Sequence, residues 1–271
     1  MQNATLRDEI RDYWSDRAES FDDQPGHGIA TETERLAWRS LLEPHVPVGA
    51  GQDALDLACG TGEMSGLLSD MGYAVTALDW SEPMLDIARR KATASGRDIS
   101  FRQADAEVTM EPDATYSLVL TRHLVWTLVD PRAAFAEWHR ILRPGGRLVI
   151  IDGDFVRRPF TARLLDRLAT WAGDVSRQRA SQLGARHAAI LDRVYFRNGA
   201  RADEVVAMLR EAGFQDIVTD RRLRKVNRAI ARRHGALEGL RREVQHRYVI
   251  SAVRPGEGEP LCPVTAARDA T

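Results

Sequence analysis

The sequence predicts an α/β protein with a doubly wound, mostly parallel sheet, and two observations carry this prediction. First, short apolar runs between about residues 53 and 153 (ALDLA, AVTALD, ISFRQAD, YSLVLT and GRLVIID) alternate with longer helical stretches. Such alternation is typical of parallel strands joined by helices on both faces of the sheet. Second, Ser81 and Asp130 are N-cap residues followed by a proline in the first turn. We expect Pro144-Gly145-Gly146 to end the helix that Asp130 opens.

Further elements flank this alternating core. Before it, the sequence predicts amphipathic helices at residues 5–22 and 30–43, joined by the turn DQPGHG. After it we expect, in chain order, a helical stretch at 159–195, a helix and a strand in ARADEVVAMLREAGFQDIVTD, an Arg-rich and partly helical region at 221–245, and a last strand HRYVISAV. The predicted domains are a helical lid (1–45), a main domain (46–255) with a helical insertion at about 157–198, and a disordered tail (256–271).

The composition is that of an ordinary globular protein. Of the 271 residues, 44% are hydrophobic, and 38 basic residues nearly balance 39 acidic ones, so no nucleic-acid or membrane partner is required. The two cysteines, Cys59 and Cys262, are too few for a disulfide framework or a zinc site, and we predict no metal. The polar N-terminus is unlike a signal peptide, and no apolar run approaches the ~20 residues of a membrane helix. We therefore expect a cytoplasmic protein.

The stretch ALDLACGTGEMSGLL, residues 54–68, brings small residues to the end of the first strand, where a ligand can approach the backbone. A dinucleotide loop would need a third glycine where Ser65 stands, and no Gly-Lys-Ser/Thr follows for a phosphate loop. Asp56 would repel a phosphate but suits a cation. Asp79, which closes the second strand, can accept hydrogen bonds from ribose hydroxyls. S-adenosylmethionine has these features: a ribose, a positive charge and no phosphate.

Five pieces of the chain together resemble the class I S-adenosylmethionine-dependent methyltransferases. They are LDLACGTG (55–62), ALDWSEPMLDIARRKA (77–92), FRQADAE (101–107), YSLVLTRHLVWTLVDP (116–131) and ILRPGGRLVIID (141–152). They cover over a third of the chain in family order and spacing. The resemblance implies a Rossmann-like sheet of seven strands with an added helical lid, and S-adenosylmethionine as the cofactor. The segment YWSDRAESFD (13–22) resembles the part that closes over the cofactor in small-molecule members.

The resemblance also implies roles for individual residues. Asp56 and the Gly60 carbonyl would hold the methionine ammonium, Asp79 would bind the ribose, and Asp105 would accept from the adenine amino group. The whole implied cofactor set is Asp56, Ala58, Cys59, Gly60, Gly62, Asp79, Trp80, Met84, Asp105, Ala106, Thr121 and Arg122, with Tyr13 and Arg17 covering the cofactor from the N-terminal helix.

Structural alternatives to these roles stay open. Asp79 could cap a helix, Trp80 could simply pack, and Cys59 has the features of a small buried residue without chemistry. Tyr13 and Arg17 could belong to the core and the surface of their own helix.

Candidates for the methyl acceptor's site follow from the predicted topology. The pocket of an open parallel sheet lies beyond the carboxyl ends of its strands, so residues just after the fourth and fifth strands are candidates. The predicted catalytic residues are His123, His27 and Asp152. The two histidines are candidates because imidazole titrates near neutrality. Each residue also has a structural alternative: His123 as a packing residue, His27 as a loop residue and Asp152 as a helix cap. The predicted substrate-binding residues are Trp126, Asp154, Tyr195 and Arg197.

We therefore expect a methyltransferase that acts on a small metabolite or natural product by direct displacement, with homodimer formation left open. Two enzymatic alternatives remain: another use of the cofactor, such as aminocarboxypropyl transfer or cyclisation, and methylation of RNA. The Arg-rich region 221–247 keeps an anionic partner open, although a solvated helix face explains it as well. The fourth strand ends in TRHL and not in a base-reading Asn-Pro-Pro-Tyr, which disfavours nucleic acid. A protein that only binds the cofactor is a third class.

Overall fold

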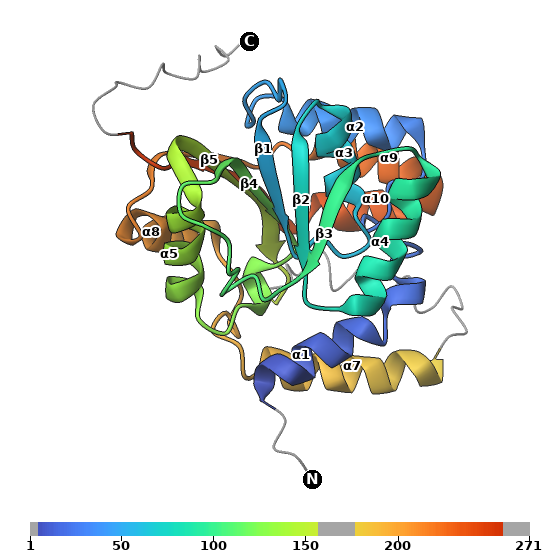
Figure 1. The fold of residues 1–271 in the computed structure, drawn as a ribbon. Coiled ribbons are helices and arrows are strands. Elements are labelled where there is room, and N and C mark those ends of the chain that lie inside the picture. The colour runs from blue at the N-terminus through green and yellow to red at the C-terminus, as the bar shows by residue number, and fades with distance from the viewer. Residues whose placement is uncertain (1–4, 157–176, 257–271) are drawn as a thin grey trace, which may run out of the picture.

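The computed structural model describes residues 5–156 and 177–256, without the side chains of 177–183. A sheet of seven strands forms its centre, in the order β3-β2-β1-β4-β5-β7-β6 (Figure 1). The strands are β1 (Asp53–Leu57), β2 (Ala74–Asp79), β3 (Ile99–Gln103), β4 (Tyr116–Arg122), β5 (Leu142–Asp154), β6 (Gln215–Asp220) and β7 (His246–Val253). Strands β1 to β5 are parallel, and β7 runs antiparallel to both β5 and β6. The predicted mostly parallel, Rossmann-like sheet is confirmed.

Helices follow the strands at the positions that the sequence signals indicate. They are α1 (Leu6–Ser15), α2 (Glu32–Leu42), α3 (Glu63–Asp70), α4 (Glu82–Ala94), α5 (Pro131–Ile141), α7 (Arg177–Leu191), α8 (Ala202–Glu211), α9 (Arg224–His234) and α10 (Ala236–Glu243), with short 3-10 turns at Ala18–Ser20 and Val125–Thr127. The side chains of Ser81 and Asp130 accept hydrogen bonds from the Met84 and Ala133 amides, as expected of N-caps. Thr5 and Thr31 cap α1 and α2 with complete capping boxes.

The helix that Asp130 opens ends earlier than predicted. It stops at Ile141, and β5 begins at Leu142, so Pro144-Gly145-Gly146 lies inside the strand. The β4–β5 register jumps there, from Tyr116 opposite Leu142 to Leu118 opposite Arg147. Gly145 has a φ of +78°, and a Cβ on Gly146 would lie 2.8 Å from the Arg143 carbonyl oxygen. These glycines allow a bulge that keeps the chain in the sheet.

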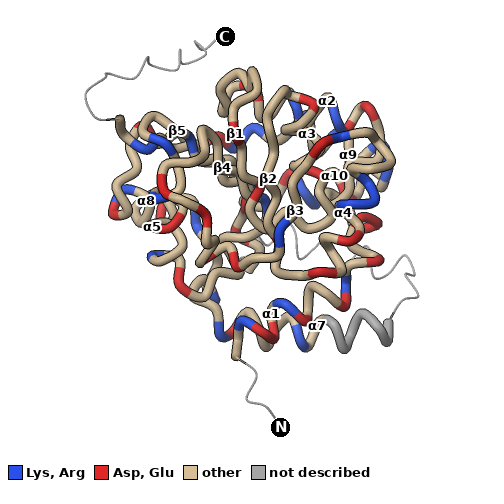
Figure 2. Tube along the Cα trace, viewed as in Figure 1, with Lys and Arg blue, Asp and Glu red and all other residues tan. Residues whose placement is uncertain are grey.

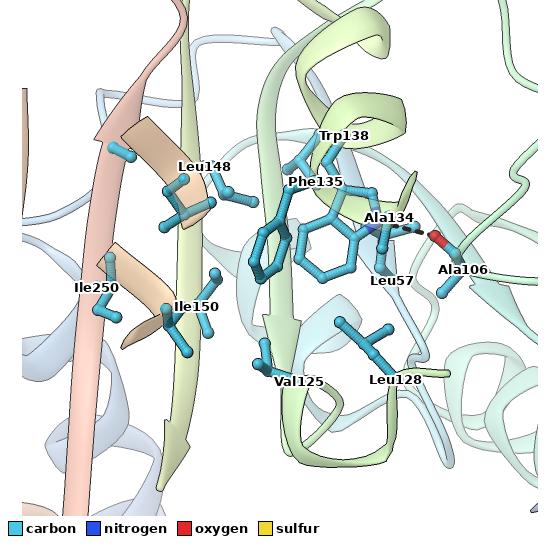
Figure 3. Packing of buried hydrophobic residues seen from close by; sticks show 14 of the residues in the cluster. Leu57, Ala106, Val125, Leu128, Ala134, Phe135, Trp138, Leu148, Ile150 and Ile250 are labelled. Atoms are coloured by element: carbon cyan, nitrogen blue, oxygen red, sulfur yellow. Dashed lines mark hydrogen bonds between the residues drawn. The ribbon is translucent and has the colours of Figure 1, made fainter. Parts of the chain in front are cut away.

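Two apolar layers bury the faces of the sheet. One face packs against α5 and α8, where Phe135 and Trp138 meet Leu148 and Ile150 of β5 (Figure 3). The Trp138 indole donates a hydrogen bond of 2.7 Å to the Ala106 carbonyl, which satisfies its only polar atom. The other face packs against α2, α3 and α9. The two layers hold the strands in place, and the site lies at the ends of these strands.

The N-terminal segment crosses the edge formed by the carboxyl ends of the parallel strands. The hydroxyl of Ser15 in α1 lies 2.8 Å from that of Ser81, and Asp22 accepts from the Thr61 hydroxyl at 2.6 Å. Helix α1 lies beside α7, and acidic and basic residues alternate along it (Figure 2). The division into lid, main domain and insertion stays a prediction. Residues 157–176 of the predicted insertion and 257–271 of the predicted tail lie outside the described residues.

Candidate active site

The sheet has its topological switch between β1 and β4, because the chain leaves β3 at one edge and returns to pair with β1. Loops after these two strands diverge, and ligands of open α/β sheets bind in the crevice between them. A first pocket lies there. It is lined by parts of α1, the glycine turn after β1, the end of β2, and the segments after β3 and β4.

The glycine turn is strained in a way that brings backbone to this pocket. Ala58, Gly60 and Gly62 have φ angles of +54°, +55° and +82°. Such angles cost a residue with a side chain of the order of 1–3 kcal/mol. A Cβ on Gly62 would stand 3.0 Å from that of Ala88, so the turn packs closely against α4. Ala58 and Gly60 line the first pocket, whereas Gly62 lies against a separate pocket behind it.

Asp79 holds this turn from the end of β2. One of its oxygens accepts from the Gly60 amide at 2.7 Å and the other from the Ser81 amide at 2.8 Å. Burial raises the pKa of Asp79 to about 6, against the opposing effect of these hydrogen bonds. A carboxylate has about four acceptor positions, so two remain for a ligand in the pocket that Asp79 lines.

Asp56 lies behind the turn and is 1% exposed. It accepts a hydrogen bond of 2.5 Å from the Ser65 hydroxyl, and burial raises its pKa to about 7. Asp56 does not line the first pocket. A cationic group at the turn would favour its charged form.

Asp105 and Glu107 form the far wall of the first pocket and pair with helix α1. Arg7 of α1 donates to Asp105 at 3.0 Å and to Glu107 at 2.6 Å. Glu107 also accepts from the amides of Val129 and Asp130. Burial raises the pKa of Glu107, while these amides and Arg7 oppose the rise. One cluster of ion pairs and hydrogen bonds thus joins α1, the segment after β3 and the segment before α5.

A second pocket adjoins the first on the side of α7. Its described lining comes from α1 and the turn after it, the DQPGHG turn, and residues near the ends of β4, β5 and β7. Trp14, His27 and His123 line both pockets, so the two spaces share one wall. Tyr13 and Arg17, predicted to cover the cofactor, line the second pocket and not the first.

His27 and His123 stand together in this wall, with ring centroids 5.4 Å apart. His123 has a φ of +63°, which is uncommon for a residue other than glycine. An Arg247 nitrogen lies 3.3 Å from His123 Nε2. Because a guanidinium can only donate, His123 Nε2 accepts this hydrogen bond and the ring is neutral. Burial lowers the pKa of His27 to about 3 and that of His123 well below its usual value, and Arg122 and Arg247 add to both shifts. Both rings are weak bases in this state.

Two arginines donate hydrogen bonds to backbone carbonyls of the DQPGHG turn. Arg122 donates to the His27 carbonyl at 2.6 Å and stacks over Trp38 at 5.2 Å. Arg242 donates to the Pro25 carbonyl at 2.8 Å. This support fixes the backbone of His27.

The other predicted residues fall into two groups. Trp80, Met84 and Ala106 line the first pocket, and Trp126 lines the second. Residues outside both linings are Cys59, Thr121, Asp152, Asp154, Tyr195 and Arg197.

Most of these outlying residues have structural partners or face solvent. The Thr121 hydroxyl donates to the Leu57 carbonyl, and Asp152 accepts from the amides of Val125 and Gly153. Asp154 fills the space beside Gly199. Tyr195 is exposed and lines a different pocket.

Sequence reasoning missed Trp14, Phe155, His187 and Arg247, which line the pockets. Trp14 stands in the quoted YWSDRAESFD segment, and Phe155 follows the IDGD of β5. Arg247 belongs to the Arg-rich region 221–247, for which the sequence left both an anionic partner and a solvated helix face open. Its place at the start of β7, next to β5, brings it to the site.

Comparison with known proteins adds a family to this geometry. Residues 55–150 match the family described as "Methyltransferase domain". This part of the chain is therefore similar to methyltransferase domains. The matched residues include the glycine turn, Asp79, Asp105 and His123.

Individual relatives and solved structures agree. A demethylmenaquinone methyltransferase of Thermus thermophilus is 37% identical over 119 residues, which is 43% of this chain and 54% of the relative. The chain thus spans about half the length of that relative. Phosphoethanolamine N-methyltransferase 2 of Haemonchus contortus, solved with S-adenosyl-L-methionine, has a TM-score of 0.64 at 17% identity over 94% of this chain and 61% of its own. The cyclase SpnF has a TM-score of 0.61 at 18% identity over 93% and 98%. The likeness to these two structures is one of fold.

None of the helices in the described part of the chain is long and apolar enough to cross a membrane. No group of three or more His, Cys, Asp and Glu in the same residues is placed to hold a metal ion.

Proposed function

We propose that this chain transfers the methyl group of S-adenosylmethionine to a small-molecule acceptor. The observation that carries the proposal is the meeting of two pockets at the wall formed by Trp14, His27 and His123. The cofactor would occupy the first pocket and the acceptor the second. Their reacting groups would then meet where the two pockets adjoin, beside Trp14, His27 and His123.

The first pocket fits the cofactor by its donor set. The Asp79 carboxylate has acceptor positions for the ribose hydroxyls, and Trp80, Met84 and Ala106 offer an apolar wall for the adenine. Asp56 supplies a negative charge close to the glycine turn, where the ammonium would lie. The Asp105 oxygen that pairs with Arg7 would be shared with the adenine amino group.

The bound cofactor would supply an activated methyl group on a sulfonium. The protein's part is then to align the acceptor and to exclude water, which can account for several kcal/mol of the barrier. Ile10 and Trp14 of α1 and Phe21 after it cover the first pocket from the lid. Their cover is held by the Arg7 ion pairs.

Two measurements test the proposal. Calorimetric titration with S-adenosylmethionine and S-adenosylhomocysteine should show binding of both. Incubation with methyl-labelled cofactor and pools of small-molecule acceptors should then yield labelled product and S-adenosylhomocysteine. Formation of methylthioadenosine instead would replace methyl transfer by another use of the cofactor, and absence of cofactor binding would refute the proposal.

A further inference from the structure

The second pocket has a one-sided charge. Its described lining contains two arginines, Arg17 and Arg247, and neither aspartate nor glutamate. The first pocket differs, since Asp79, Asp105 and Glu107 line it together with its arginines. The space beyond the shared wall is therefore electropositive.

Neither arginine forms a salt bridge with a carboxylate of the described residues. Arg247 donates to the Gln245 side chain at 2.8 Å, contacts His123, and lies over the Phe155 ring at 5.2 Å. Arg17 lies over the rings of Tyr13 and Trp14, and its Nε is buried without a hydrogen-bond partner. Nearby Arg186 contrasts with both, because it pairs with Asp16 at 2.6 Å.

Such an arrangement is costly for a protein that holds nothing there. Both guanidinium groups are half-buried, and a charge that is partly withdrawn from water is stabilised by a partner of opposite charge. Burial lowers the pKa of Arg247 well below its usual value. Arg242 and Arg122 add to this shift, whereas the charges of Asp152 and Glu238 oppose it. A ligand oxyanion would supply the missing charge, and guanidinium forks bind carboxylate and phosphate groups in pairs of hydrogen bonds.

Aromatic rings form the rest of the wall. Tyr13, Trp14, Trp126 and Phe155 line the pocket, and successive rings stand edge to face with centroids 5.0, 6.2 and 6.1 Å apart. The cavity measures about 540 Å³. Rings in this arrangement bind flat or apolar bodies and exclude water.

We infer that the second pocket takes an acceptor that carries an oxyanion on an aromatic or otherwise apolar body, with Arg17 and Arg247 binding the oxyanion. That this ligand is the methyl acceptor rests on the proposed function, whereas the anion site itself depends on the pocket alone. The shared ligand chemistry is that of a carboxylate or a phosphate.

This inference also explains the weak bases in the shared wall. His123 Nε2 already accepts from Arg247 and cannot take a proton from an acceptor without losing that bond. If the group that receives the methyl enters the pocket already deprotonated, no base is needed, because it has no proton to lose when it bonds to the methyl carbon. The positive field of the arginines favours that ionised form.

The test is a comparison of charged and neutral probes of equal shape. Benzoate and its neutral analogue benzamide, and separately phenyl phosphate, are titrated into the protein by ligand-observed NMR, with and without saturating S-adenosylhomocysteine. We expect an anion to bind at least about ten-fold more tightly than benzamide, as for hydrogen bonds to charged groups. The tighter of benzoate and phenyl phosphate distinguishes the two anion sources.

Variants locate the effect. Arg17→Gln and Arg247→Gln should each remove most of the preference for the anion. Arg132→Gln on α5, whose exposed side chain pairs with Glu211, should leave it unchanged. Thermal unfolding checks that each variant is folded, and Arg247→Lys, which keeps the charge without the fork, should retain part of the preference if Arg247→Gln does not fold.

The proposal fails if benzamide binds as tightly as the anions, if no anion binds at millimolar concentration, or if the preference survives in either glutamine variant. Failure of the proposed function has a different signature. In that case S-adenosylhomocysteine does not bind, whereas the anion preference measured without it persists.

Discussion

Asp79 shows at the scale of one residue how a single carboxylate can both build a turn and serve a ligand. Its two oxygens hold the amides of Gly60 and Ser81, and it closes β2 at the edge of the pocket. The structural alternative, a helix cap, does not apply, because the side chain that caps α4 is that of Ser81.

Replacement of Asp79 by Ala should weaken S-adenosylmethionine binding by about 1.5–3 kcal/mol, because hydrogen bonds to a charged group are lost. Calorimetric titration measures the change. Asp86→Ala, on the exposed face of α4, is the control and should bind as the wild type does. Wild-type affinity in the Asp79 variant would remove this residue from the cofactor site.

His27 gives a second prediction at this scale. With a pKa of about 3, its ring should stay neutral from pH 8 down to pH 5. Nitrogen-detected NMR of the histidine rings follows the titration, with the urea-unfolded chain as the reference, where a pKa near ~6.5 is expected. A His27 ring that titrates near neutrality in the folded protein would restore it as a candidate general base.

At the scale of elements, helix α1 acts as a cover because its charged face meets the sheet edge. Arg7 crosses from α1 to Asp105 and Glu107, and Glu107 in turn fixes the amides that precede α5. The capping box at Thr5 begins α1 close to Arg7 and so orients it. Cofactor affinity should therefore depend on this ion pair.

Arg7→Gln should lower the affinity for S-adenosylhomocysteine about five-fold, which corresponds to about 1 kcal/mol for a partly exposed pair with one buried partner. Arg39→Gln on α2, whose partner Glu43 is exposed, is the matched control. Calorimetry gives the affinities, and faster amide exchange in α1 of the Arg7 variant would show that the cover is looser. Equal affinity in the two variants would contradict the role of α1.

The elements were largely predictable, and the exceptions have physical reasons. Strand and helix positions follow from local periodicity and caps, which Ser81 and Asp130 illustrate. The predicted end of α5 was wrong. The helix stops before the Pro-Gly-Gly segment, because Leu142 already pairs with β4 in the sheet. The first pocket follows motifs near the strand ends, whereas Arg247 reaches the second pocket only through the antiparallel pairing of β7 with β5, which no local pattern reveals.

At the scale of the whole molecule, stability depends on the charge state of three buried carboxyl groups. Burial raises the pKa of Asp79 to about 6 and those of Asp56 and Asp152 to about 7. A carboxyl whose pKa is raised on folding stabilises the fold at low pH, and this contribution is lost as the pH rises through the folded value. The ligand-free protein should therefore lose stability from these three groups between about pH 4, near the pKa of an unfolded aspartate, and about pH 7. The neutral histidines act in the opposite direction below about pH 6.5, because protonation then favours the unfolded chain.

Cofactor binding should offset this loss, because a cation beside Asp56 and hydroxyls on Asp79 favour the ionised carboxyls. We expect the rise in Tm caused by saturating S-adenosylhomocysteine to grow from about pH 5 to pH 7 and to level off above pH 7, with protons released on binding below that pH. Calorimetry in two buffers of different ionisation enthalpy counts those protons. Asp56→Asn isolates one group, and its stability should fall less than that of the wild type over the same pH range. A ligand-induced shift in Tm that is independent of pH would show that the cofactor leaves the protonation of these carboxyls unchanged, and would place its ammonium away from Asp56.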